Sequence, residues 1–174
     1  NVLAWIEATV SSRTLSLGAT EDIRLEPRTP IRCRLVLRDV RGLHLDGPGM
    51  IHAPEIDTHR LALDVSGSGT LVVGGRLVGD TLQARLRGSG SIRCHLRGLV
   101  ALQEIELGGS GLYEARDLES ESVRASVRGS GSGVVRVRDE LDVTITGSGS
   151  FLYVGEPEVS KDVRGTGTVV SLSS

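Results

Sequence analysis

The sequence predicts an all-β protein built as a single-domain parallel β-helix, a solenoid of about 7–8 rungs that turns at Gly-Ser-Gly corners. Three observations predict this fold. A Gly-X-Gly triplet recurs seven times, at spacings of 18 to 21 residues. Apolar and polar residues alternate before each triplet, and no useful length of chain has the 3.6-residue period of an amphipathic helix. A unit of about 20 residues buries its apolar face only by stacking on equivalent units.

A corner is expected at each triplet. The triplet glycines are Gly47, Gly49, Gly67, Gly69, Gly88, Gly90, Gly109, Gly111, Gly129, Gly131, Gly147, Gly149, Gly165 and Gly167. Glycine is used where the backbone needs a positive φ or where a side chain has no room, so one edge of the solenoid should be a row of tight turns. The run Gly129–Gly133 falls in this register and is expected to be a turn, not a nucleotide-binding loop.

A strand is expected on each side of a corner. Residues two and four positions before the triplet are apolar in almost every repeat, and those one and three positions before it are mostly polar. This period of two predicts a half-buried strand. A short apolar run such as Leu71–Val73 or Phe151–Val154 predicts a second strand after the corner, followed by a return segment. Equivalent strands of stacked repeats lie parallel, ~4.8 Å apart.

The first 40 residues follow the repeat less closely. Strands are expected at Leu15–Leu17, Ile23–Leu25 and Ile31–Leu37, with a loop at Glu26–Pro30. Terminal repeats are often atypical because they cap the stack. We therefore expect one domain, 1–174, in which residues 1–40 cap the regular repeats of 41–174.

Composition excludes some classes of partner. The net charge is −2 and the pI about 6.1, so neither a nucleic acid nor an anionic membrane surface is expected. No stretch approaches the ~20 apolar residues of a membrane-spanning helix. Cys33 and Cys94 alternate with apolar neighbours and are expected to be buried. About three rungs between them exclude a disulfide, so both are expected to be free thiols.

No group of residues in the sequence indicates catalysis, a cofactor or a metal. The four histidines lack the i, i+2 and i, i+4 spacings of a metal-binding pair. A polysaccharide lyase is the enzyme alternative for a β-helix. Its sites need clustered carboxylates and aromatic platforms, whereas the carboxylates here alternate with arginines and the chain has four aromatic residues. We therefore expect no catalytic, cofactor-binding or metal-binding residue.

Charged residues at outward positions form a candidate binding strip. Asp64, Arg85 and Glu106 hold the same position in successive repeats, and Arg87 and Arg128 belong to the row next to the corners. Neighbouring charges of opposite sign predict a ladder of cross-rung salt bridges, at about 0.2–1 kcal/mol per pair. The alternative is a strip that binds a polar ligand, in which the arginines contact anionic glycans.

The serial Gly-Ser-Gly repeats end in Ile145–Val163, which reads ITGSGSFLYVGEPEVSKDV. With these features nearly the whole chain resembles the "putative auto-transporter adhesin, head GIN domain" family, although Gly47-Pro48-Gly49 departs from the Gly-Ser-Gly pattern. The opening Asn1–Ile6 is similar to the middle of that family's first section, so the chain is expected to be truncated at its N-terminus. The resemblance implies a pectin-lyase-like β-helix in exported bacterial proteins, often lipoproteins. It implies no conserved catalytic set, and a role in cell adhesion by analogy with trimeric autotransporter heads.

These observations predict a non-enzymatic structural module at the bacterial surface or in the periplasm, acting in cell adhesion. Its partner would be a host surface, a glycan or an envelope protein, and the family analogy allows a homo-oligomer, a trimer. The alternative is a periplasmic, envelope-associated module that binds another protein, and a polysaccharide lyase is the less favoured third hypothesis. The first two hypotheses imply export, with a signal peptide that is absent from this sequence.

Overall fold

The computed structural model describes residues 2–20 and 30–172. The chain divides into two compact units, Asn1–Leu37 and Arg38–Ser174. The prediction that the first 40 residues cap the repeats within one domain stays a prediction.

The first unit contains a short helical turn and a hairpin. A 3-10 turn, η1 (Val2–Trp5), leads into β1 (Ile6–Ser11), which pairs antiparallel with β2 (Thr14–Ala19). The two residues between the strands, Ser12 and Arg13, have φ values of 50° and 66°. Two residues with positive φ are typical of a turn whose twist matches that of the strands it joins, which explains the tight connection.

The structure decides two of the expectations for this unit. The strand predicted at Leu15–Leu17 is confirmed within β2. The strand predicted at Ile31–Leu37 is wrong, and Cys33 within it is exposed where burial was expected. Alternating apolar residues form a strand only beside a hydrogen-bonded neighbour, and this segment pairs with no strand in the part of the chain that the structure describes. The predictions at Ile23–Leu25 and for most of Glu26–Pro30 lie outside the described residues.

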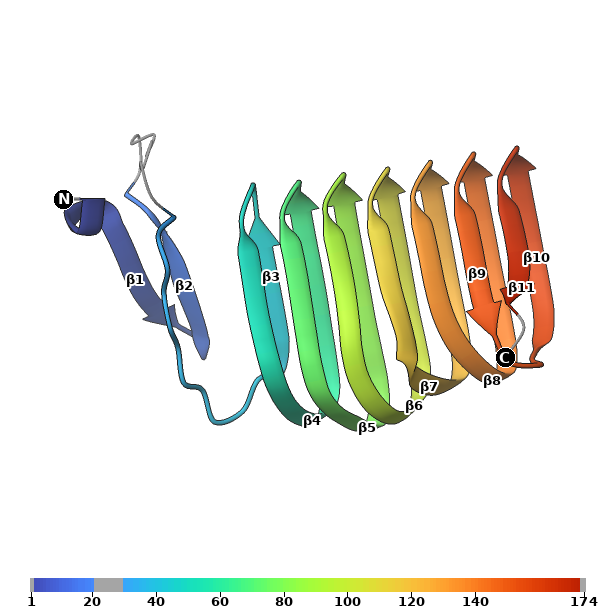
Figure 1. Cartoon of the computed structure of the whole chain (residues 1–174), viewed down its shortest axis with the longest axis horizontal. Coiled ribbons are helices and arrows are strands. Elements are labelled where there is room, and N and C mark those ends of the chain that lie inside the picture. The colour runs from blue at the N-terminus through green and yellow to red at the C-terminus, as the bar shows by residue number, and fades with distance from the viewer. Residues whose placement is uncertain (1, 21–29, 173–174) are drawn as a thin grey trace. The chain divides into compact units, whose positions relative to one another are not determined.

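The second unit is a parallel β-solenoid of about seven turns (Figure 1). Its strands are β3 (Gly42–Asp46), β4 (Met50–Gly67), β5 (Thr70–Gly88), β6 (Ser91–Gly109), β7 (Leu112–Gly129), β8 (Ser132–Gly147), β9 (Ser150–Val154), β10 (Glu158–Gly165) and β11 (Thr168–Leu172). Consecutive strands pair in parallel from β3 to β9, then β11 pairs with β9 and β10 with β8. Among the described residues there is no α-helix. The predicted all-β parallel β-helix is confirmed.

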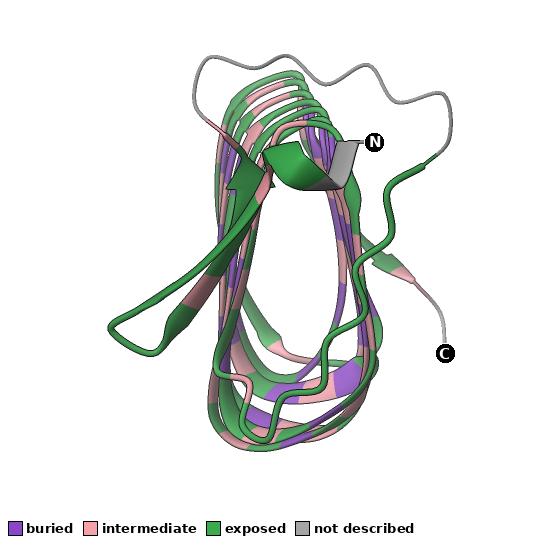
Figure 2. Ribbon diagram, turned by 90° about the vertical axis from the view of Figure 1, so that its left-hand side faces the viewer, coloured by how far each residue is buried: buried purple, intermediate pink, exposed green. Residues whose placement is uncertain are grey.

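Each complete turn is one long strand that bends, not two strands with a separate return segment. Strands β4 to β8 are 16 to 19 residues long. Viewed along the stack, they form two walls joined by a bend opposite the corners (Figure 2). The pre-corner wall consists of residues 42–46, 60–66, 81–87, 102–108, 122–128, 140–146 and 158–164. The post-corner wall consists of residues 50–54, 70–74, 91–95, 112–116, 132–136, 150–154 and 168–172.

The two glycines of a corner are needed for different reasons. The first glycine of every triplet has a positive φ, as at Gly109 (φ 109°), where L-residues are strained. The second glycine generally lacks space: a Cβ on Gly149 would lie 2.6 Å from Cγ1 of Val127 on an earlier rung. The amide between them bonds to the corner below, as in Ser110 N to Gly88 O at 2.9 Å. From Gly88 on, the first glycine of each corner therefore meets both expectations, positive φ and close approach to the preceding corner, whereas the second is a glycine for lack of space alone.

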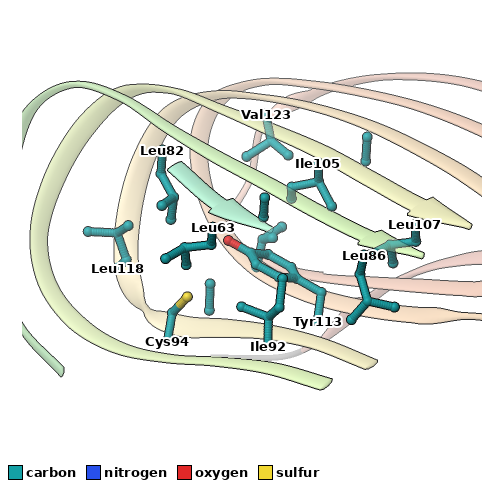
Figure 3. Close-up of a cluster of buried hydrophobic side chains, with 14 of the residues drawn as sticks. Leu63, Leu82, Leu86, Ile92, Cys94, Ile105, Leu107, Tyr113, Leu118 and Val123 are labelled. Atoms are coloured by element: carbon teal, nitrogen blue, oxygen red, sulfur yellow. The ribbon is translucent and has the colours of Figure 1, made fainter. Parts of the chain in front are cut away.

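The core lies between the walls and is filled by side chains that the alternation predicts (Figure 3). One column runs through Tyr113, Gly133 and Phe151, which are paired in register. A Cβ on Gly133 would lie 2.5 Å from Cε2 of Phe151, so the glycine makes room for the ring. Gly133 therefore belongs to β8 and to the core, and the turn predicted at Gly129–Gly133 ends before it.

A hydrogen-bonded polar chain crosses this core. The hydroxyl of Tyr113 donates to Oε1 of Gln103 at 3.1 Å, and Nε2 of Gln103 donates to Oγ of Ser120 at 2.6 Å. All three residues are fully buried. Buried polar groups are costly unless they are paired. The chain of bonds explains how Gln103 occupies a position that is apolar in the other repeats from the second triplet on.

Candidate functional site

The predicted strip lies on the outward face of the pre-corner wall, which we call the charged wall. The ladder pairs Asp64 with Arg85 and Arg85 with Glu106, so these three lie side by side on β4, β5 and β6. Arg87 and Arg128 lie in the row next to the corners, but a glycine of β6 stands between them. The structure thus brings the first three residues together and separates the two arginines by one rung.

Only some of these charged residues form ion pairs with a residue on another rung. Arg85 Nε lies 3.6 Å from Glu106 Oε2, and both side chains are about half exposed. Asp64 forms no ion pair with Arg85 directly opposite. Its Oδ2 lies 3.9 Å from Nη1 of Arg87, diagonally across the rungs, and its Oδ1 lies 3.7 Å from Nδ1 of His44 on β3. Exposed pairs of this kind contribute about 0.2–1 kcal/mol each. Arg128 forms no ion pair with any residue that the structure describes.

Sequence reasoning overlooked a second charged row, five positions before the corner. The ladder places Gln83, Glu104, Arg124 and Asp142 opposite one another on β5 to β8. Nε2 of Gln83 donates to Oε2 of Glu104 at 2.7 Å. The signal was present in the sequence, because extending the same alternation by two residues reaches this row.

The charged wall contains a hollow of about 310 Å³. Its outward lining on β7 includes the short Ser126, at a position where β6 carries the longer Glu106, and the buried Ile105 and Ala125 lie at its base. The other polar lining residues are Gln83, Arg85, Glu104, Arg124, Asp142 and Thr144. A hollow with charges of both signs and no aromatic lining suits a hydroxylated or mixed-charge group better than an apolar ligand.

Charge on this wall alternates from rung to rung. The outward charged residues are Arg85 and Arg87 on β5, Glu104 and Glu106 on β6, Arg124 and Arg128 on β7, and Glu140 and Asp142 on β8. Every second side chain of a strand points to the same face of the sheet, so the outward charges of one strand form a row along it. Each of these four rungs is therefore a stripe of one sign, ~4.8 Å from a stripe of the other sign.

The groups with shifted pKa values lie inside the core, away from the charged wall. Burial raises the pKa of the Cys94 thiol to about 12. Burial also raises the pKa of the Tyr113 phenol well above its usual value, and the neighbouring Cys94 adds to this. Both groups are sealed from solvent, so neither is presented to a ligand.

Within residues 2–20 and 30–172, no three or more His, Cys, Asp and Glu side chains are grouped so that they could hold a metal ion. No helix in the described part of the chain is long and apolar enough to cross a membrane.

The profile of the family described as "Putative auto-transporter adhesin, head GIN domain" matches residues 1–157. A comparison with curated proteins gives no match.

Solved structures share the fold. A "putative adhesin" from Bacteroides fragilis NCTC 9343 superposes with a TM-score of 0.88 at 24% identity, covering 98% of this chain and 78% of its own. A "putative lipid binding protein" from Parabacteroides distasonis ATCC 8503 has a TM-score of 0.70 at 21% identity, with 98% and 80% covered. A "putative adhesin" from Parabacteroides merdae ATCC 43184 has a TM-score of 0.69 at 19% identity, with 98% and 79% covered. At these identities the likeness establishes the fold alone.

Proposed function

The chain belongs to the auto-transporter adhesin head GIN domain family, and from this premise we propose that it is a non-enzymatic adhesion module, exported to the bacterial surface or periplasm, that binds its partner through the charged wall. The observation that carries the proposal is the wall itself. Charged side chains stand on it at fixed positions, ~4.8 Å apart from rung to rung, above a fully packed core. Solenoids use such extended faces to bind partners.

Two features of the wall support a binding role over a purely structural one. Arg124 and Arg128 form no ion pair with a described residue, so their charge is free to meet a partner. The hollow lies beside Arg124 and is lined by two arginines, Arg85 and Arg124, together with carboxylates. Carboxylates and guanidinium groups together can bind hydroxyl groups and opposite charges at the same time.

The non-enzymatic part of the proposal rests on where the chemistry lies. Catalytic groups with shifted pKa values face a cleft, whereas Cys94 and Tyr113 are enclosed in the core. Incubation with acidic polysaccharides and Ca²⁺ tests the lyase alternative, and unsaturated products would overturn this part of the proposal.

A periplasmic module that binds an envelope protein is the second candidate function. The mixed signs of the wall favour it, because a protein surface offers both charges whereas an anionic glycan offers one. Capture of a specific envelope protein by the purified chain, with no binding to matrix or glycans, would select this candidate over adhesion.

The test compares two variants with the same change of charge. The Arg85→Ser/Arg87→Ser variant removes two arginines from the charged wall. The Arg93→Ser/Arg97→Ser variant removes two exposed arginines from the first half of β6. Binding of the full chain to immobilised matrix proteins, a glycan panel and cells should weaken on the order of tenfold for the first variant only.

Two results would count against the proposal, the first against adhesion and the second against the charged wall as the binding face. One is a wild-type chain that binds none of these surfaces, together with a deletion strain that adheres normally. The other is equal binding by the two variants, which would place the contact away from the charged wall.

A further inference from the structure

The order of charge on the charged wall carries information about the partner. From β5 to β8 the stripes read positive, negative, positive, negative. A surface with this order is complementary to itself when it is displaced by one rung. A partner that recognises every stripe must repeat the same alternation with the same ~4.8 Å spacing, and a second copy of this chain has both properties.

We propose that the charged wall binds the charged wall of a second copy, with the two solenoid axes antiparallel and a two-fold axis running along the strands between β6 and β7. This arrangement places β6 against β7 of the partner and β5 against β8 of the partner. Every stripe then faces a stripe of opposite sign. The inference rests on the proposed function and names the partner of its binding face.

The same order of charge excludes the parallel arrangement. If the two-fold axis ran along the solenoid axis, each rung would face the same rung of the second copy. The arginine stripes would then meet arginine stripes, and the carboxylate stripes would meet each other. Like charges placed opposite one another across an interface suppress a pairing. A closed two-fold contact on this wall is therefore antiparallel.

Individual residues fit this geometry. Rotation about an axis along the strands keeps the row positions, so Glu104 faces Arg124 of the second copy, and Arg124 faces Glu104. Glu106 faces Ser126, a short side chain beside the hollow. The hollow extends from β5 to β8, centred on the proposed axis, so it leaves space for the long side chains of both copies.

The size of the wall predicts a weak contact. The four stripes at ~4.8 Å, with about seven residues each at ~3.3 Å, cover roughly 440 Å² per copy. The total of roughly 900 Å² is below the standard size of specific interfaces and in the range of transient encounters. Such a contact joins cells through many copies at once and not through one tight dimer.

Sedimentation of the full chain tests the inference. Wild-type protein should show a monomer–dimer equilibrium whose dissociation constant rises on the order of tenfold between about 50 mM and about 500 mM NaCl, because exposed charges are screened. The Arg124→Glu/Arg128→Glu variant makes β6, β7 and β8 all acidic and should be monomeric. The Glu104→Arg/Glu106→Arg variant makes β5, β6 and β7 all basic and should also be monomeric.

An equimolar mixture of the two variants is the decisive measurement. Acidic β6 and β7 of one variant then face basic β7 and β6 of the other, so the mixture should dimerise although neither variant does alone. The Arg93→Glu/Arg97→Glu variant, which reverses two charges elsewhere on β6, should dimerise like the wild type. Circular dichroism confirms that each variant is folded.

Each outcome is decisive. A wild-type monomer at low salt, a trimer, a dimer unaffected by the wall variants, or a mixture that stays monomeric would overturn the inference. If the wall variants nevertheless lost binding to glycans, matrix or an envelope protein, the proposed function would stand without homotypic contact. Salt-sensitive dimers without adhesion would leave the contact established and refute the proposed function.

Discussion

A methyl group at position 133 should destabilise the solenoid, because Gly133 makes room for an aromatic ring. Its Cβ would lie 2.5 Å from Cε2 and 2.7 Å from Cδ2 of Phe151. The ring is fully buried, so it cannot swing toward solvent to relieve the contact. Gly133 has no positive φ, so its backbone accepts alanine and the effect of Gly133→Ala is steric.

The magnitude follows from two opposing contributions. Overpacking a core typically costs about 1–3 kcal/mol. Replacing glycine by alanine where the backbone permits it restores about 0.4–1 kcal/mol through the entropy of the unfolded chain. The net loss should be about 1–2 kcal/mol. For a protein of this length it corresponds to a decrease in Tm of roughly 2–8 °C.

A smaller residue at position 151 isolates the contact. Phe151→Leu should itself cost about 1–2 kcal/mol through lost packing, but it leaves space for the methyl group. Urea unfolding followed by circular dichroism should therefore show that Gly133→Ala no longer destabilises the Phe151→Leu background. Additive effects of the two substitutions, or a Gly133→Ala variant as stable as the wild type, would refute the steric explanation.

Three other predictions concern the corners, the buried polar chain and the thiols. Gly109→Ala should cost about 2 kcal/mol or more, because the position has a positive φ and contacts the corner below. Gly108→Ala is the control: its Cβ would have only one neighbouring atom, at 3.7 Å, so this variant should melt like the wild type. Equal melting temperatures of the two variants would contradict the prediction. Gln103→Leu should cost about 2–4 kcal/mol because both hydroxyl partners lose a bond, and replacing those hydroxyls as well should recover stability in urea titrations. Burial raises the pKa of Cys94 from 9.0 to about 12, so the contribution of this thiol to stability is present below pH 9 and is lost as the pH rises toward 12. Cys94→Ala should therefore make stability less dependent on pH in this range. A thiol reagent should label only Cys33 in the native chain.

The repeat explains why so much of the fold was predictable. A glycine triplet that recurs every 18 to 21 residues marks the corners, and stacking then determines which strands are neighbours. The alternation before each triplet determines which side chains enter the core, as for Leu63, Leu86 and Val127. The same two signals place Asp64, Arg85 and Glu106 in one row.

The errors occurred where local pattern and long-range pairing disagree. Ile31–Leu37 alternates like a strand, but a strand also needs a neighbour with which to form a ladder. Gly133 extends a glycine-rich run, and only the ring of Phe151 on the next rung explains it. The return segments looked irregular because the bend carries register shifts, as between Ala53 and Ile56, although the strand continues through it.

Function is harder to read because the two faces of each strand are constrained differently. Inward positions must fill the core, so the pattern of inward residues indicates the fold but not the function. Outward positions do not have to fill the core. If their charges served only to stabilise this molecule, isolated ion pairs such as Arg85 with Glu106 would be enough. On β7, however, Arg124 and Arg128 form no such pair with a described residue, yet their strand keeps the alternation of sign. The charges on the wall are therefore ordered more regularly than the ion pairs within one chain require. From this additional order we infer a partner with matching stripes.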